Sequence, residues 1–510
     1  ISCAVPTDRL ASVWVIGSEQ SSRQQAIRRG FASSGRPGAE TSWQRVSKML
    51  DKYIGQWSSM YVQACEATNV RGAQSSEVLD LRMACLSDNL EQVRAFTDLF
   101  AAGDHAATTN AVTALQSLTP VQRCADVAAL KSAVPLPRDE RTLVSVNALR
   151  DRLRRAQALR DVLNPRKAME AAEALLPDAE ATQYRPLIAQ TLEIIGCLET
   201  DSKKAEKALR EAVVDAESAH DDVTAATAAA DLIGVVGYYR GLTEEAEFWA
   251  RLSNAMLDRV ATPQLRIRSW TVNNLASVIA NGGDFERALP LTQQAVALKR
   301  ESLGPDHPDV AISLHNLSET LTELGRGEAA LRAADEALDI VTKHGDPDTV
   351  EVVMSHHVRG DALFVLGRLD EAEAEFNICM KGLRYQNAES DPEMGHALHG
   401  LGDIWRARGD TAKALGFFEQ AMQLRERSET SPLLKADTRF ALARTLWDAG
   451  GDRARAQRLA EEARALLSPL SFQARQRAIA TWLATHHARD RVPEKEGRRS
   501  ISGRATRAAR

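Results

Sequence analysis

The sequence predicts an all-α protein in which an N-terminal helical domain precedes an α-solenoid, a curved array of helical hairpins. The first observation is a glycine that returns every 42 residues, at Gly241, Gly283, Gly325, Gly367, Gly409 and Gly451. The second is an alanine five residues after each glycine, at Ala246, Ala288, Ala330, Ala372, Ala414 and Ala456. A fixed period of this length is typical of stacked units, each of which buries its apolar face against its neighbours.

One unit, residues 306–342, shows why each period should form a helical hairpin. Before the glycine, the spacings of three and four that mark an amphipathic helix are present at Val310, Leu314, Leu317 and Leu321. Gly325 then supplies the left-handed conformation that closes a helix. Alanines crowd one face of the segment that follows, so we expect its backbone to pack closely and antiparallel against the first helix.

A small residue also stands seven positions before each of the first five glycines, at Gly234, Ala276, Ser318, Gly360 and Gly402. Together with the turn glycine and two small residues seven apart in the second helix, this pattern resembles the tetratricopeptide repeat. The 42-residue period and the connection 303–311 are similar to the kinesin-light-chain type of that repeat. The resemblance implies a right-handed superhelix whose first helices line a concave groove, with a protein or peptide as the partner.

The periodicity divides the chain into a helical N-terminal module, degenerate hairpins, six regular repeats, a capping helix and a basic tail. We place these segments at 1–140, 141–222, 223–467, 468–487 and 488–510. The second segment is degenerate because Ala168 and Ala205 have left the 42-residue step. The tail holds eight Lys or Arg and three acids, and we expect it to be disordered.

Charge, apolar stretches and the first residue limit which kinds of protein this chain can be. The net charge of −5 excludes a protein that binds nucleic acid through its overall charge. No stretch approaches the ~20 apolar residues needed to cross a bilayer, and no signal-peptide core is present. The chain begins with Ile1 instead of methionine, so we expect a fragment or a product whose start lies upstream.

The predicted groove carries polar residues at fixed places. Ten positions before the glycines stand Asn273, His315, His357 and His399, and six positions before stand Ser277, Glu319, Asp361 and Asp403. Histidine and carboxylate are therefore neighbours at i and i+4 in three repeats. Zinc is excluded, because adjacent repeats lie ~10 Å apart whereas zinc ligands lie ~2 Å from the ion. Two interpretations stay open: a solvated helix face, or a polar ladder that binds a peptide. The second predicts tighter binding of acidic ligands near pH 5.5 than near pH 7, because histidine gains its charge in that window.

Three further expectations concern single residues. Asn274 and Asn316 either hold the main chain of a bound peptide or bond the backbone of a neighbouring helix. His356 and His396 have no counterpart in the other repeats, so we expect them at the surface. Cys379 replaces an alanine at a helix contact, and packing accounts for it.

The N-terminal module lacks the period and holds four of the six cysteines. Helices are expected at 41–68 and 76–101, where apolar residues follow helical spacing. Four cysteines allow three pairings, so buried free thiols and one or two disulfides both stay open for Cys3, Cys65, Cys85 and Cys124. No Cys-x-x-Cys pair is present, which argues against a zinc site.

Several stretches of this module resemble the region that follows the membrane helix in certain bacterial serine/threonine protein kinases. They are residues 26–31, 34–37, 57–68, 74–75 and 79–86, with Cys65 and Cys85 among them. The resemblance implies a non-catalytic sensor or docking region on the extracytoplasmic side of the inner membrane. The alternative is a free-standing, cytoplasmic repeat scaffold. No phosphate loop, His-Arg-Asp or Asp-Phe-Gly motif is present, so we expect neither a catalytic residue nor a cofactor.

Overall fold

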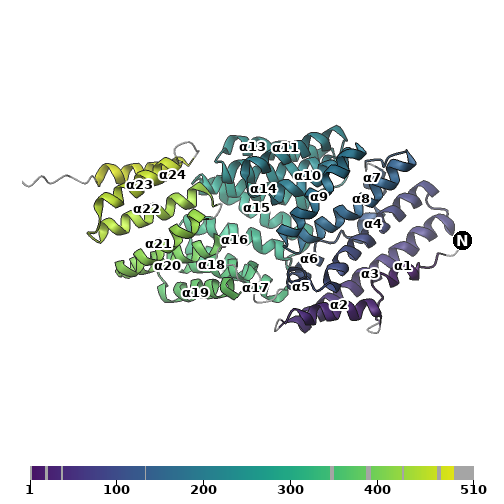
Figure 1. Ribbon diagram of the computed structural model, residues 1–510, viewed down its shortest axis with the longest axis horizontal. Coiled ribbons are helices and arrows are strands. Elements are labelled where there is room, and N and C mark those ends of the chain that lie inside the picture. Colours follow the sequence, from purple (N-terminus) through teal and green to yellow (C-terminus); the bar gives the residue numbers. More distant parts are fainter. Residues whose placement is uncertain are drawn as a thin grey trace, which may run out of the picture.

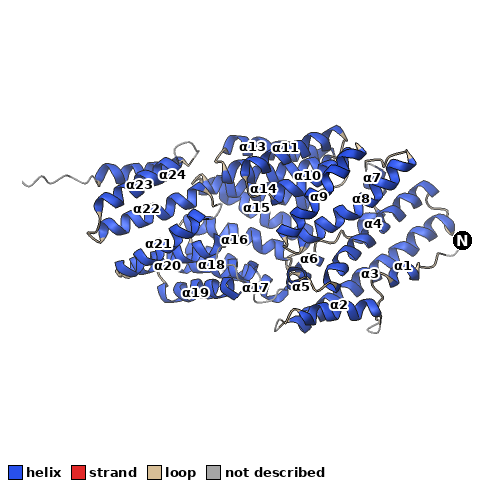
Figure 2. Ribbon diagram, viewed as in Figure 1, coloured by secondary structure: helices blue, strands red, loops and turns tan. Residues whose placement is uncertain are grey.

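The protein is described by a computed structural model that covers residues 3–17, 21–35, 38–131, 134–344, 350–385, 392–427, 430–467 and 472–486. Within these residues every regular element is helical (Figure 2). The helices follow one another from the N-terminal module to the opposite end of an elongated molecule (Figure 1). The predicted all-α class is therefore confirmed. The expected tail, 488–510, lies outside the described residues.

The N-terminal module contains two long helices and several short ones around an aromatic core. Trp14 and Trp43 lie with ring centroids 5.8 Å apart, and Phe31 packs on Trp43 and Phe100. Leu159 of the next helix belongs to the same core, so the module and the start of the array are packed as one unit. The elements of the module are α1 (Thr7–Ala11), α2 (Ser22–Ser33), α3 (Ala39–Asn69), α4 (Ser76–Ala101), α5 (His105–Thr109), α6 (Ala111–Leu115), the 3₁₀ turn η1 (Val121–Ala125) and α7 (Val127–Lys131).

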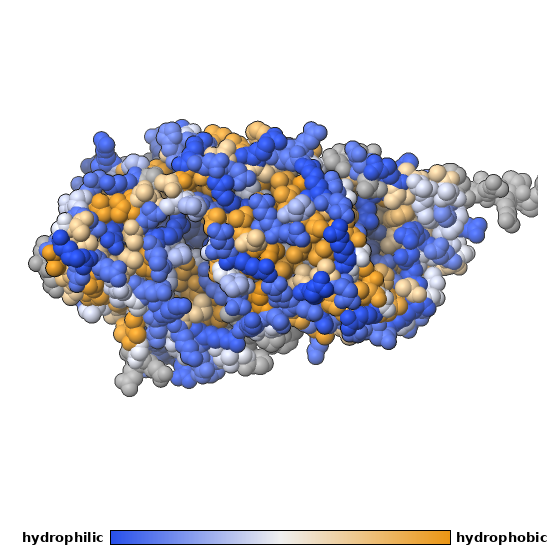
Figure 3. Space-filling model, turned by 180° about the vertical axis from the view of Figure 1, so that it is seen from behind, coloured by the Kyte–Doolittle hydropathy of each residue, from blue (hydrophilic) through white to orange (hydrophobic). Residues whose placement is uncertain are grey.

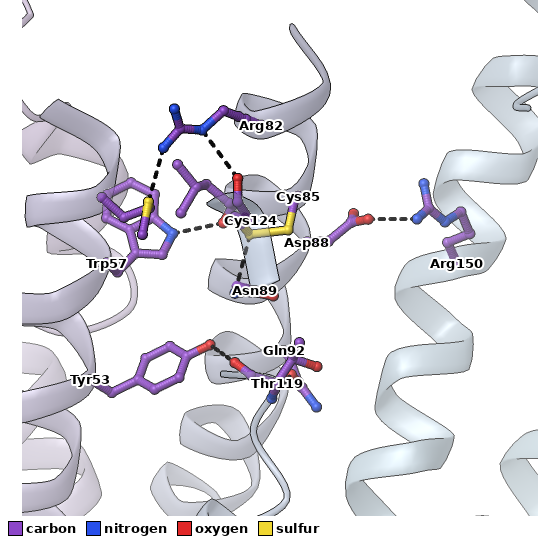
Figure 4. Close-up of a disulfide and its surroundings, with 12 residues drawn as sticks. Tyr53, Trp57, Arg82, Cys85, Asp88, Asn89, Gln92, Thr119, Cys124 and Arg150 are labelled. Carbon is purple, nitrogen blue, oxygen red and sulfur yellow. Dashed lines mark hydrogen bonds and ion pairs between the residues drawn. A yellow bond between two sulfur atoms is a disulfide. The ribbon is translucent and has the colours of Figure 1, made fainter. Parts of the chain in front are cut away.

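Two disulfides fasten this module. Cys3 is bonded to Cys65 and Cys85 to Cys124, which is one of the three pairings that four cysteines allow. Figure 4 shows the second bridge, which ties η1 to α4. The Arg82 guanidinium donates from Nε to the Cys124 carbonyl at 3.1 Å, beside the bridge. These contacts fix η1 against the middle of the module.

Eight helical hairpins follow in the described part of the chain. In each, we name the first helix the A-helix and the second the B-helix. The pairs are α8 (Glu140–Asp161) with α9 (Pro165–Thr182), α10 (Arg185–Leu198) with α11 (Ser202–Ser218), α12 (Asp222–Gly234) with α13 (Thr243–Arg259), α14 (Leu265–Asn281) with α15 (Phe285–Leu303), α16 (Pro308–Glu323) with α17 (Gly327–His344), α18 (Val350–Val365) with α19 (Leu369–Tyr385), α20 (Pro392–Ala407) with α21 (Thr411–Arg427), and α22 (Pro432–Asp448) with α23 (Arg453–Leu467). A π-helical turn, η2 (Val235–Tyr239), extends α12.

The repeat glycines adopt the left-handed conformation at the positions that the period predicts, with one exception. Gly325 has φ +69°, and four other repeat glycines are also left-handed. In the last hairpin the left-handed residue is Gly450, φ +66°, so the prediction of Gly451 is wrong by one residue. The reason is that α22 is capped at Ala449, and the residue after the cap takes the turn conformation.

Small residues inside the A-helices make room for large ones on the B-helices. Phe376 of α19 is fully buried and is enclosed by Gly360 of α18 and Gly400 of α20. A Cβ atom at these glycines would lie 2.9 and 2.4 Å from the phenyl ring. The ring therefore joins two consecutive hairpins, because only glycine lets both A-helices approach it so closely.

The array curves toward the side of the A-helices. Consecutive A-helices contact each other along the array. The last helix, α24 (Gln473–Thr485), packs on α23 and brings Arg475 to 3.4 Å from Glu323 of α16 (Nη2 to Oε2), four A-helices back. A pair so distant in sequence can meet only across a concave side. On the face turned away from Figure 1, hydrophilic residues dominate and hydrophobic ones show between them (Figure 3). No helix among the described residues is long and apolar enough to span a bilayer.

Candidate ligand-binding face

The concave side presents an inner row, which we define as the residues ten positions before the turn glycines: Asp231, Asn273, His315, His357 and His399. Four of them bond to the A-helix of the following repeat. Ser313 Oγ donates to Asn273 Oδ1 at 2.8 Å, and His315 Nε2 lies 2.7 Å from Ser355 Oγ. His357 Nδ1 lies 3.0 Å from Glu393 Oε2, and His399 Nδ1 lies 3.2 Å from Thr438 Oγ1. The inner row thus fastens one repeat to the next.

The expected histidine–carboxylate pairs form in two of three repeats. His357 Nε2 lies 3.0 Å from Asp361 Oδ2, and His399 Nε2 lies 3.4 Å from Asp403 Oδ2. The pair with Glu319 was wrongly predicted, because His315 is buried against Ser355 whereas Glu319 is exposed. The solvated-face interpretation is also wrong for His315 and His357, which are only 1% and 5% exposed.

Burial decides the charge of these histidines. For His315 it lowers the pKa to about 4, and for His399 to about 3. Burial also opposes a charge on His357, but the carboxylates of Asp361 and Glu393 outweigh it and raise the pKa of that imidazole well above its ordinary value. The expected gain of histidine charge between pH 7 and pH 5.5 is therefore wrong for the inner row, since two members stay neutral and one is already charged.

The asparagines beside the inner row bond to neighbouring helices. Asn274 Nδ2 donates to the Ala230 carbonyl at 2.9 Å. Asn316 Nδ2 donates to Asn273 Oδ1 at 3.1 Å and to Ser277 Oγ at 3.2 Å. Asn274 thus makes the backbone bond of the second alternative, whereas Asn316 contacts side chains of the previous repeat.

The two histidines expected at the surface are partly buried and have specific neighbours. His396 packs on His357 with ring centroids 4.8 Å apart, and burial lowers its pKa well below the ordinary value. His356 Nδ1 lies 2.6 Å from Oε2 of the buried Glu375. Repeat-wide comparison missed both, because each has a partner that occurs in one repeat only.

Glu319 is an exposed carboxylate of the inner face. It is exposed and has no ion-pair partner among the described residues, whereas Asp361 is paired with His357 and Asp403 with Arg406. Protein surrounds Glu319 on the concave side, and this desolvation, together with nearby carboxylates such as Glu393, raises its pKa to about 7. An unpaired carboxyl group in such surroundings gains most from an incoming cation.

A second cluster, which sequence reasoning missed, lies earlier on the concave side. The ligand atoms of Glu193, Cys197 and Asp231 all lie within 4.8 Å of one another. Arg160 Nη1 donates to both Glu193 oxygens at 3.1 and 3.2 Å, and Trp270 Nε1 donates to Asp231 Oδ1 at 2.9 Å. Burial and the Glu193 carboxylate raise the pKa of Asp231 to about 7. Extending the inner row back to Gly241 would have given Asp231, but α10 has no turn glycine that would align Glu193.

Comparison with known proteins supports the repeat architecture. Residues 267–343 and 351–427 match the tetratricopeptide repeat family. No curated protein is significantly similar to the chain.

Several solved structures are similar in fold. The TPR-like repeats of a kinesin light chain from Podosopora anserina match 40% of this chain and 95% of their own, with 23% identity and a TM-score of 0.30. BtubC from P. vanneervenii matches 53% of this chain and 95% of its own, with 18% identity and a TM-score of 0.32. A Rap protein in complex with competence and sporulation factor matches 68% of this chain and 100% of its own, with 14% identity and a TM-score of 0.43.

Proposed function

We propose that the repeat array binds an extended peptide along its concave side, and that a basic side chain of this peptide lies against Glu319. Tetratricopeptide repeats are interaction modules whose curved surface suits an extended ligand. The observation that carries the proposal is the exposed Glu319 carboxyl group, which has no ion-pair partner among the described residues, whereas Asp361 and Asp403 at the matching positions are paired. A lysine or arginine would supply the missing counter-charge.

We propose further that the chain is the non-catalytic sensor or docking region of a bacterial serine/threonine protein kinase whose kinase domain lies outside it. The residues of the N-terminal module that resemble such kinases support this proposal. The two disulfides fit it as well, because disulfides persist in oxidising compartments such as the extracytoplasmic side of a bacterial inner membrane. The alternative is a free-standing repeat scaffold or adaptor with no kinase attached.

Peptide selection with a matched pair of variants tests the first proposal. The chain is panned against a random library of linear peptides, and the selected peptides are measured against wild type, Glu319→Gln and Glu301→Gln. Glu301 is an exposed carboxylate on the B-helix α15, so its variant makes the same charge change away from the concave side. Enrichment of basic residues and weaker binding by Glu319→Gln alone support the proposal. Equal effects of both variants contradict it.

The coding DNA upstream of the Ile1 codon tests the second proposal. An open reading frame that encodes a kinase domain and an apolar span of ~20 residues supports a sensor region. A stop codon followed by a start signal supports the free-standing scaffold. This result is independent of peptide binding, so the two proposals stand or fall separately.

A further inference from the structure

We propose that Glu193, Cys197 and Asp231 form a binding site for a thiophilic divalent cation such as Zn²⁺. In the described part of the chain this is the one place where three ligand atoms from His, Cys, Asp or Glu converge within 4.8 Å. Glu193 and Cys197 are one helical turn apart on α10, and Asp231 lies on the next A-helix, α12. Two adjacent A-helices therefore contribute the three ligands.

The spacing suits tetrahedral coordination after small side-chain rotations. Ligand atoms that lie 2.0–2.3 Å from zinc are about 3.3–3.8 Å apart at the corners of a tetrahedron. The present upper limit of 4.8 Å exceeds this by about 1 Å, so the ligand side chains have to move toward one another by about this distance when the ion binds. Cys197 is exposed, so water or a ligand group from solvent can reach the site and complete the shell.

Donors from the two flanking A-helices orient the carboxylates. Arg160 of α8 holds both oxygens of Glu193, which is itself only 8% exposed. Trp270 of α14 holds one oxygen of Asp231. Hydrogen bonds of this kind fix the orientation of metal-ligating carboxylates. The two donors lie on α8 and α14, the A-helices on either side of the cluster, so Glu193 and Asp231 are each oriented by a neighbouring helix.

The donor set selects the class of metal. Calcium and magnesium bind through oxygen ligands alone, whereas a thiolate favours zinc, cobalt and similar ions. On binding, the Cys197 thiol releases its proton to water and becomes the thiolate ligand. The three anionic ligands and the positive Arg160 then have a net charge of about −2, which one divalent cation neutralises. Asp161, 3.4 Å from Arg160, adds a further negative charge nearby.

Cobalt titration of the full chain, with its disulfides intact, tests the site. Co²⁺ bound to a thiolate gives a charge-transfer band in the near ultraviolet, which carboxylate or imidazole ligands do not give. The variants are Cys197→Ser, Asp231→Asn and, as a matched control, Cys379→Ala. Cys379 is the other cysteine outside the two disulfides, and it stands at a position where four of the other repeats have alanine.

We expect the band in wild type and in Cys379→Ala, its absence in Cys197→Ser, and Zn²⁺ binding at least about tenfold weaker in Asp231→Asn. Thermal melting of the metal-free variants checks that each is folded. The proposal is overturned if wild type shows no band, if the band survives in Cys197→Ser, or if Asp231→Asn binds Zn²⁺ as tightly as wild type.

Discussion

His357 Nδ1 lies 3.0 Å from Glu393 Oε2, so the charged imidazole of α18 is paired with a carboxylate in the first turn of α20. Asp361 holds the other ring nitrogen at 3.0 Å. The two preceding inner-row residues bond to a serine of the next A-helix: Asn273 to Ser313, and His315 to Ser355. Each serine stands two residues before the inner-row position of its own helix. On α20 the corresponding position is Ala397, whose side chain has no polar group. Glu393, one helical turn earlier on the same helix, bonds to His357 instead.

Removing the Glu393 carboxylate should destabilise the array strongly. Glu393→Gln leaves the buried His357 charge with one carboxylate instead of two. We expect the free energy of unfolding to fall by up to about 3 kcal/mol, which is less than the full cost of an unpaired buried charge because Asp361 still pairs with His357. Urea unfolding followed by circular dichroism measures this. Glu371→Gln, which removes an exposed carboxylate of α19 that is paired with Arg368 at the surface, is the control and should shift the midpoint only slightly.

The neutral histidines of the inner row should make stability depend on pH. Burial lowers the pKa of His315 to about 4, whereas an unfolded histidine titrates near 6.5. Between pH 6.5 and pH 4 the histidine is protonated in the unfolded state but not in the folded state. The contribution of the neutral His315 to the free energy of unfolding is therefore complete above pH 6.5 and is lost as the pH falls toward 4. Between pH 7 and pH 5, wild type should lose about 2 kcal/mol relative to His315→Gln.

Unfolding of both proteins at the two pH values checks this. His105→Gln changes an exposed histidine of α5 and serves as the control. A constant difference between wild type and His315→Gln at both pH values would mean that His315 titrates in the folded protein as it does in the unfolded chain.

Phe376 should be coupled to the glycines that enclose it. Phe376→Ala should cost about 3–5 kcal/mol, as large-to-small changes in a core do. Gly400→Ala places a Cβ atom 2.4 Å from the ring and should destabilise wild type. In the Phe376→Ala background the same change should be nearly harmless, because the ring is gone. A double-mutant cycle measures the coupling, and additive effects would contradict the close contact.

Reduction of the disulfides should loosen the N-terminal module before the array. Cys85 and Cys124 close a loop of 39 residues, and opening such a loop costs about 4 kcal/mol by chain entropy. Limited proteolysis with and without reductant should show new cleavage near η1, while α14 to α23 stay protected. Intact mass after alkylation in denaturant checks the bridges directly: without reductant, two bridges leave only the thiols of Cys197 and Cys379 to be alkylated.

Sequence reasoning predicted the hairpins because their signals repeat. A left-handed glycine and a small residue in the A-helix are needed in every unit, so they recur at a fixed step and are visible without a structure. Gly450 shows the limit, since two adjacent glycines satisfy the same pattern and only the cap at Ala449 selects between them.

Sequence reasoning selected the inner-row residues by their register, but it did not predict their bonds. Whether a histidine pairs along its own helix or with the next repeat depends on the residue opposite, as Ser355 and Ala397 show. The histidine at position 396 has no counterpart in other repeats, and its place against His357 follows from packing alone. Glu193 was missed for a related reason, because α10 lies outside the regular step.

The role of Glu319 is the central claim, and its pKa provides the most direct test. Desolvation on the concave side and the carboxylates of Glu393, Asp361 and Glu323 raise the pKa of Glu319 to about 7, while the charged His357 acts in the opposite direction. A bound lysine stays charged up to about pH 10, so binding should follow the Glu319 carboxylate. That carboxylate is about tenfold more populated at pH 8 than at pH 6.

The measurement is the dissociation constant of one selected basic peptide at pH 6 and pH 8, for wild type, Glu319→Gln and Glu301→Gln. We expect wild type and Glu301→Gln to bind up to about tenfold more tightly at pH 8, and Glu319→Gln to bind more weakly with little dependence on pH. If Glu319→Gln binds as tightly as wild type at pH 8, the basic side chain does not lie against Glu319 and the proposed binding face is wrong.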